Sequence, residues 1–133
     1  MRYRILVAGA LLWIVGTVAI RLGGHGLLHP NRPVATLDLY LASFALMALL
    51  VPRIFRRLRV ESDSWPAAAT LLMLPTLILD PFSCVFFTSL FPNADPGVAG
   101  VFGGWILIFC AGAVAGVWLT PGVKPDLRTE SKN

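Results

Sequence analysis

The sequence predicts an all-α protein, a transmembrane four-helix bundle, and three observations lead to this fold class. Hydrophobic residues make up 56% of the chain and charged residues only 14%, against roughly a quarter in soluble domains. Four apolar runs stand out, and no stretch with β-strand alternation rivals them. The charged residues fall mainly between those runs. We therefore expect a single domain over residues 1–120, surrounded by the lipid bilayer, and a polar cytoplasmic tail over residues 121–133.

The first apolar run, residues 5–20, lies between Arg4 and Arg21 and predicts a span over about residues 4–22. As a helix the run rises roughly 24 Å, which is short for a hydrocarbon core of about 30 Å. The stem of Arg21 is expected to extend it by snorkelling. A basic start before an apolar run is also typical of a signal peptide, but the further spans favour a retained helix.

The segment behind this span holds three glycines among residues 23–26, which predicts a flexible loop rather than a helix. His25 and His29 lie four residues apart, a spacing that places two metal ligands on one helix face. No cysteine or glutamate stands near them in the sequence to complete a site. They are weak metal candidates, and we assign no metal and no cofactor.

The second run, residues 34–51, predicts a span over about residues 34–52. Pro33 suits the first turn of a helix, because its missing N–H costs little there. Pro52 and the basic stretch that follows it are expected to end the helix.

The third run begins at Trp65, with Ser64 as the expected N-cap. Its uncharged part, residues 65–79, is too short to cross alone. The span must therefore continue to about residue 90 and carry Asp80 with it. Pro75 and Pro81 each remove a helix hydrogen bond, so we expect the third helix to be kinked or broken at these prolines.

The fourth run is the longest, and its span covers residues 98–119 without a charge. A turn over residues 91–97 precedes it, rich in proline, asparagine and glycine. Glycines four or eight residues apart form a row along this helix, and small residues at such spacing let helix backbones approach closely. The row predicts a helix-packing seam, either inside the bundle or between the two chains of a homodimer. Its members are Gly100, Gly104, Gly112 and Gly116.

The basic residues are distributed unevenly between the two sides that four spans define. Both termini and the loop between the second and third spans share one side. Nine lysines and arginines fall on that side, and two, Arg21 and Arg32, fall on the other. The positive-inside rule then places both termini in the cytoplasm. The nine are Arg2, Arg4, Arg53, Arg56, Arg57, Arg59, Lys124, Arg128 and Lys132.

Asp38 and Asp80 are the acidic residues of the predicted spans, and Arg21 ends the first span on the same, outer side. A carboxylate at the centre of a span costs about 3 kcal/mol on insertion scales, so we expect Arg21 to pair with at least one of them. The three form a candidate polar cluster at the outer mouth. Two alternatives stay open: Asp80 lines a cavity and binds a cation or proton, or it serves the structure of a kinked helix. Asp38 is also explained by the helix dipole alone.

Three sequence blocks together resemble a known family. They are Leu74-Pro75 leading to Leu79-Asp80, then Phe91-Pro92-Asn93, then Phe102-Gly103-Gly104-Trp105. The chain up to about Trp118 resembles short bacterial four-span membrane proteins classed as a domain of unknown function. The resemblance implies a bacterial inner-membrane location, and it supplies no activity or catalytic residue.

Enzyme signatures such as GxSxG, HExxH or a P-loop are absent from the sequence, and we expect no enzyme. The basic residues form no face with interleaved aromatics, so no nucleic-acid partner is expected. Two roles remain. One is a structural or accessory protein that acts through helix packing or contact with a membrane-protein partner. The other is a small transporter or channel that uses Asp80 and Asp38 at an outer-facing cavity.

Overall fold

The computed structural model describes residues 2–29 and 31–121, and within them it contains helices and no strands. Four helices are long: α1 (Arg2–Leu27), α2 (Pro33–Arg57), α3 (Trp65–Val85) and α5 (Ala99–Trp118). Short helical turns, η1 (Ser62–Ser64), α4 (Phe87–Leu90) and η2 (Pro96–Val98), lie in the connections. The all-α prediction is confirmed. The four long helices have the length and apolar composition needed to cross a membrane.

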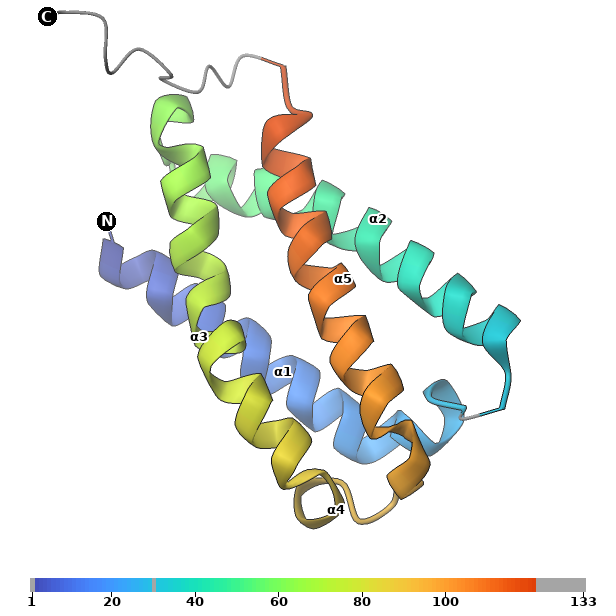
Figure 1. Ribbon diagram of the computed structural model, residues 1–133. Helices are drawn as coiled ribbons and strands as arrows, with labels where there is room; N and C mark the ends of the chain where they lie inside the picture. Colours follow the sequence, from blue (N-terminus) through green and yellow to red (C-terminus); the bar gives the residue numbers. More distant parts are fainter. Residues whose placement is uncertain (1, 30, 122–133) are drawn as a thin grey trace, which may run out of the picture.

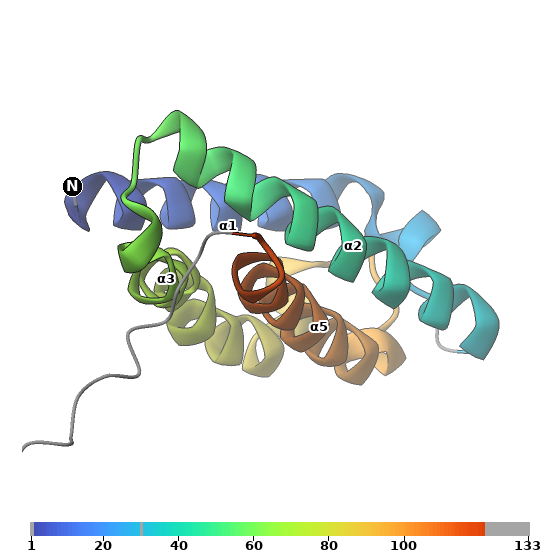
Figure 2. The same cartoon turned by 90° about the horizontal axis from the view of Figure 1, so that it is seen from above.

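The four long helices form two layers, with α1 and α2 lying over one side of the α3–α5 pair (Figure 2). Packing does not follow chain order: α1 packs on α3, α3 packs on α5, and α5 packs most extensively on α2, whereas α1 and α2 make little contact. The beginning of α1, the 58–64 connection and the end of α5 lie at one end of the bundle (Figure 1). We call this the basic end, because it carries most of the arginines among the described residues.

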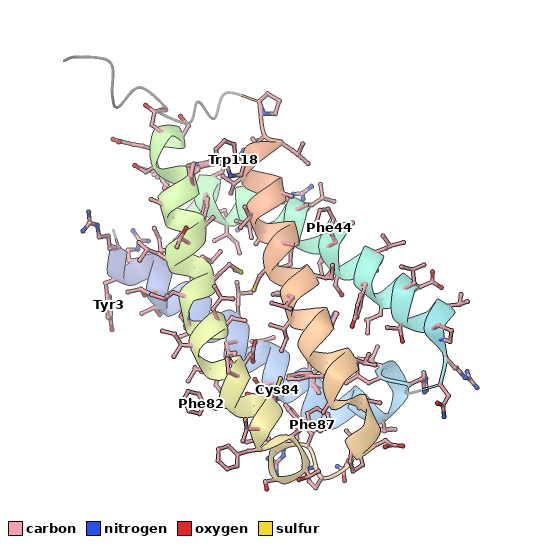
Figure 3. All side chains as sticks on the ribbon, viewed as in Figure 1. Tyr3, Phe44, Phe82, Cys84, Phe87 and Trp118 are labelled. Atoms are coloured by element: carbon pink, nitrogen blue, oxygen red, sulfur yellow. The ribbon has the colours of Figure 1, made fainter. Side chains whose placement is uncertain are left out.

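Apolar side chains occupy both the interior and the outer surface of the bundle. Met47, Val51 and Leu72 are completely buried between helices. Large apolar side chains also point outward, such as Phe82 on α3, which is 60% exposed (Figure 3). An outer surface this apolar suits lipid rather than water, as the composition predicted.

Helix α1 extends beyond the predicted span. The expected loop over residues 23–26 is wrong, because the helix continues through Gly23, Gly24 and Gly26 to Leu27. Glycine weakens a helix without forbidding it, and the neighbouring Ile20 and Leu28 are buried in the bundle. The 26-residue helix rises roughly 39 Å, which removes the shortfall expected for the first span.

Helix α2 also outruns its predicted end, since it passes Pro52 and finishes at Arg57. Pro52 is buried, as is Phe55 on the following turn, so packing holds the helix together across the missing hydrogen bond. The expected stop at Pro52 is therefore wrong, and the helix ends instead at a reversal of the backbone around Arg59, which has a φ of 55°.

Helix α3 is not broken at either proline: it runs unbroken from Trp65 to Val85 with Pro75 and Pro81 inside it. The interruption comes later, at Phe86, before the short α4 continues the chain to Leu90. The span as predicted, residues 65–90, therefore consists of two helices. Ser64 precedes α3 as expected, but its side chain makes no capping hydrogen bond.

Close approach of helix backbones depends on glycine at three places. A Cβ on Gly112 would lie 2.5 Å from the carbonyl oxygen of Phe44, and one on Gly116 would collide with the carbonyl oxygen of Ala48. Gly9 of α1 makes the equivalent contact with Leu72 of α3. These glycines set the α2–α5 and α1–α3 distances.

Candidate functional site

Asp80 lies on α3 and is only 7% exposed. The indole N–H of Trp13, on α1, donates a hydrogen bond of 2.8 Å to its Oδ1. Asp80 accepts no other side-chain hydrogen bond within the described part of the chain. From Trp65, at the basic end, Asp80 is about 22 Å along the helix axis, which places it in the half of the bundle away from that end.

A cavity of about 60 Å³ opens beside this carboxyl group, bounded by α1, α3 and α5. Its polar lining includes Thr17 of α1 and Thr76 of α3, together with Asp80 itself. No basic side chain lines it among the residues that the structure describes. The cavity exists because α1 packs on α3 and not closely on α5.

Aromatic rings form the α5 wall of the cavity. Phe102, Trp105 and Phe109 all line it, and successive ring centroids lie 6.4 and 6.2 Å apart. Phe102 also packs against Phe87 and Phe91, with ring centroids 5.4 and 5.2 Å apart. These three rings fill the end of the bundle opposite the basic end. Phe87, labelled in Figure 3, lies at that end.

Two hydrogen bonds attach this aromatic wall to α2. The indole N–H of Trp105 donates to the hydroxyl of Ser43 at 2.6 Å. The hydroxyl of Tyr40 donates to the carbonyl oxygen of Val101 at 2.8 Å. The glycine at position 104 makes room for the Tyr40 ring, because a Cβ there would collide with its hydroxyl. These contacts with α2 therefore fix the orientation of the aromatic wall.

The structure does not bring the predicted polar cluster together. Arg21 donates at 3.3 Å to the carbonyl oxygen of Leu90, whereas Asp80 accepts from Trp13. Asp38 is exposed on α2 and does not line the cavity. The expected pairing of Arg21 with a carboxylate is thus absent from the described residues. Depth along the helices was judged from the sequence, but rotation about each helix axis decides which side chains meet.

The glycine row on α5 divides into three kinds of position. Gly112 and Gly116 contact the α2 backbone, Gly104 accommodates Tyr40, and Gly100 faces open space. The close contacts lie inside one chain, so this face of α5 is already covered by α2.

The two histidines do not complete a metal site. His25 is exposed in the last turn of α1, and His29 follows the helix. Over residues 2–29 and 31–121, no group of three or more potential metal ligands occurs. Cys84 and Cys110 are both free thiols. The predicted tail falls on residues outside the described part of the chain, apart from Pro121.

Sequence reasoning missed the roles of Trp13 and Trp105, the two tryptophans of this site. Trp13 lies in the middle of an apolar run, whereas tryptophans in membrane proteins favour the interfaces. A buried indole N–H usually finds an acceptor, and the hydroxyl of Thr17 is the one side-chain acceptor that residues 5–20 offer. A tryptophan in the middle of an apolar span was therefore the available signal for a hydrogen bond to another helix.

Comparison with known proteins assigns the chain to a family. The model of a family of unknown function, DUF5367, matches residues 27–122. The chain belongs to this family. The DUF5367 match includes α2, α3 and α5, with Asp80 and the aromatic wall, but not Trp13. Neither a curated protein nor a solved structure gave a match.

Proposed function

We propose that this membrane protein binds protons or small monovalent cations at Asp80 and conducts them across the bilayer as a small transporter or channel. The observation that carries the proposal is a carboxyl group in a cavity without a basic partner. A carboxylate without a basic partner is energetically costly in a span. Protonation or a bound cation neutralises the charge and removes that cost, so such a group is suited to reversible binding of a proton or cation.

The size of the cavity limits the cargo. A water molecule needs roughly 10–15 Å³ of comparable volume, so 60 Å³ accommodates a few waters or one small cation. Sites for drug-sized ligands are typically about 300–1,000 Å³. The rings of Trp105 and Phe109 line the cavity, and aromatic rings attract cations at short range. These features support protons, alkali ions or ammonium and disfavour organic substrates.

A liposome flux assay tests the proposal. Asp80→Asn keeps an oxygen that accepts the Trp13 hydrogen bond but removes the negative charge. We expect it to retain the fold and to lose at least about tenfold of proton or sodium flux, measured with an entrapped pH-sensitive dye or isotopic sodium. Asp38→Asn is the matched control, because Asp38 is exposed outside the cavity, and its flux should equal wild type. Equal flux in all three proteins would exclude the proposal.

A second role is supported by a different observation. The Trp13–Asp80 hydrogen bond joins α1 to α3, which suits a structural or accessory protein that acts through packing or through a membrane-protein partner. This role predicts no flux in the wild type and a loss of stability, rather than of transport, when either side chain is removed. Neither role requires an enzymatic reaction, a cofactor or a nucleic acid.

We also propose a bacterial inner membrane as the location, with both termini in the cytoplasm. The basic end supports this orientation through the positive-inside rule. Asp80 then lies in the outer half of the bilayer, so the cavity would take up its cation from the outer side.

A further inference from the structure

A second cavity, of about 420 Å³, lies at the basic end. The start of α1, the connection behind α2 and the first turns of α3 enclose it. One part of its lining is apolar, with Ile5 and Leu71, and the other part is polar. The polar residues are Arg2, Arg59, Glu61 and Ser64.

Arg59 adopts a backbone conformation that is unusual for its residue type. Its φ is 55°, in the left-handed region that a side chain disfavours. The N–H of Val60 donates to the carbonyl oxygen of Phe55 at 3.0 Å, and the N–H of Arg59 donates to that of Arg56 at 3.2 Å. This is a Schellman C-cap, in which the left-handed position is usually glycine. An arginine at a position that favours glycine points to a use for its guanidinium group.

The wall behind Arg59 is rigid. The indole N–H of Trp65 donates to the carbonyl oxygen of Val60 at 3.0 Å, and its ring packs against Phe55 with centroids 5.7 Å apart. All three side chains are buried. The connection that presents Arg59 is therefore fixed before any ligand arrives.

We propose that this cavity binds the phosphate headgroup of an anionic phospholipid. Arg2 and Arg59 supply two cations against the single carboxylate of Glu61, and guanidinium groups bind phosphate oxygens in a bidentate manner. The hydroxyl of Ser64 caps no backbone group and can donate to the same headgroup. Ile5 and Leu71 continue the cavity along the apolar helices, where the acyl chains lie. The cavity sits at the end of the spans, the depth of lipid headgroups.

Lipid selectivity of the full-length protein tests this assignment. The protein is reconstituted in phosphatidylcholine nanodiscs with traces of spin-labelled phosphatidylglycerol or phosphatidylcholine, and the association ratio of the two is measured. A hydrogen bond contributes about 1 kcal/mol net, which corresponds to about fivefold in affinity. Arg2→Gln and Arg59→Gln should each lower the phosphatidylglycerol preference about fivefold.

Two further variants separate binding from folding and from general surface charge. Arg59→Gly suits the left-handed backbone, so it should raise the thermal stability while it lowers the lipid preference as far as Arg59→Gln does. Arg53→Gln removes a cation from the same end of the bundle. The guanidinium group of Arg53 donates to the carbonyl oxygen of Leu49, and Arg53 does not line the cavity. This variant should leave the preference unchanged. An equal loss in Arg53→Gln would mean diffuse attraction and overturn the site.

Inorganic phosphate distinguishes a lipid from a soluble ligand. At millimolar concentration in phosphatidylcholine nanodiscs it should neither displace labelled phosphatidylglycerol nor raise the melting temperature. Arginine-dependent stabilisation by phosphate alone would contradict the lipid assignment and identify a soluble phosphate as the ligand. Because Asp80 lies far along the bundle from this cavity, its flux assay succeeds or fails separately.

Discussion

The carboxyl group of Asp80 is buried and accepts a hydrogen bond from the indole N–H of Trp13, which joins α3 to α1. The sequence identified Asp80 as a carboxyl group in a span that required an explanation. It did not identify Trp13 as the partner, because the direction in which a side chain leaves a helix depends on packing that the sequence does not reveal. Arg21 was the natural choice by charge and depth, yet it donates to the backbone at Leu90. The nearest charge along the membrane normal is thus a poor guide to the actual contact.

We predict energetic coupling between the side chains of Trp13 and Asp80. Trp13→Phe and Asp80→Ala each remove the 2.8 Å hydrogen bond, so the double variant should lose about 1 kcal/mol less than the sum of the single losses, within the range for side-chain hydrogen bonds in membranes. Reversible unfolding in mixed detergent micelles measures the cycle. The comparison cycle of Arg21→Gln with Asp80→Ala should be additive. Coupling in that cycle, and none with Trp13, would restore the ion pair.

Helices were easier to predict than their ends. Each long apolar run became a helix, because an unpaired backbone is not tolerated in lipid. Two ends were misjudged, at Gly23 and Pro52, where local preference argued for a stop but the helices continue. Burial of neighbouring side chains outweighed a propensity cost of about 1 kcal/mol for glycine. The loss of one hydrogen bond at a proline was outweighed in the same way.

The glycines of α5 give a prediction at the level of elements. Gly112→Ala and Gly116→Ala should each destabilise the protein by about 1–3 kcal/mol, because the added Cβ meets the α2 backbone and forces the helices apart. Gly100→Ala is the matched control: it faces open space and should be neutral or slightly stabilising. Unfolding midpoints of the three variants decide the matter. Equal effects at positions 100 and 116 would argue against close packing at this seam.

For the whole molecule, composition and charge predicted the class of protein and the number of long helices, but not the order in which the helices pack. Hydropathy predicts which segments enter lipid, but it does not predict which helices pack against one another. The cavity at Asp80 follows from that order, since α1 lies against α3 and away from α5. A site made by an arrangement of helices therefore had no signature in any one of them.

The orientation of the whole molecule can be tested by thiol labelling. In a Cys84→Ala, Cys110→Ala background, Ser62→Cys lies in the connection at the basic end and Asn93→Cys lies in the turn at the other end. A membrane-impermeant maleimide added to intact cells should label Asn93→Cys and spare Ser62→Cys until the membrane is opened. The reverse pattern would place the basic end outside.

The packing order also has a consequence for biogenesis. Because α1 and α2 make little contact, these two consecutive spans do not form a stable hairpin during synthesis. The partner of α1 is the next long helix, α3, whereas the partner of α2 is α5, which is made after α3. Chains stopped before α5 would present the seam of α2 to lipid and to quality-control proteases. The four-helix bundle therefore forms only when α5 enters the membrane and packs against both α2 and α3.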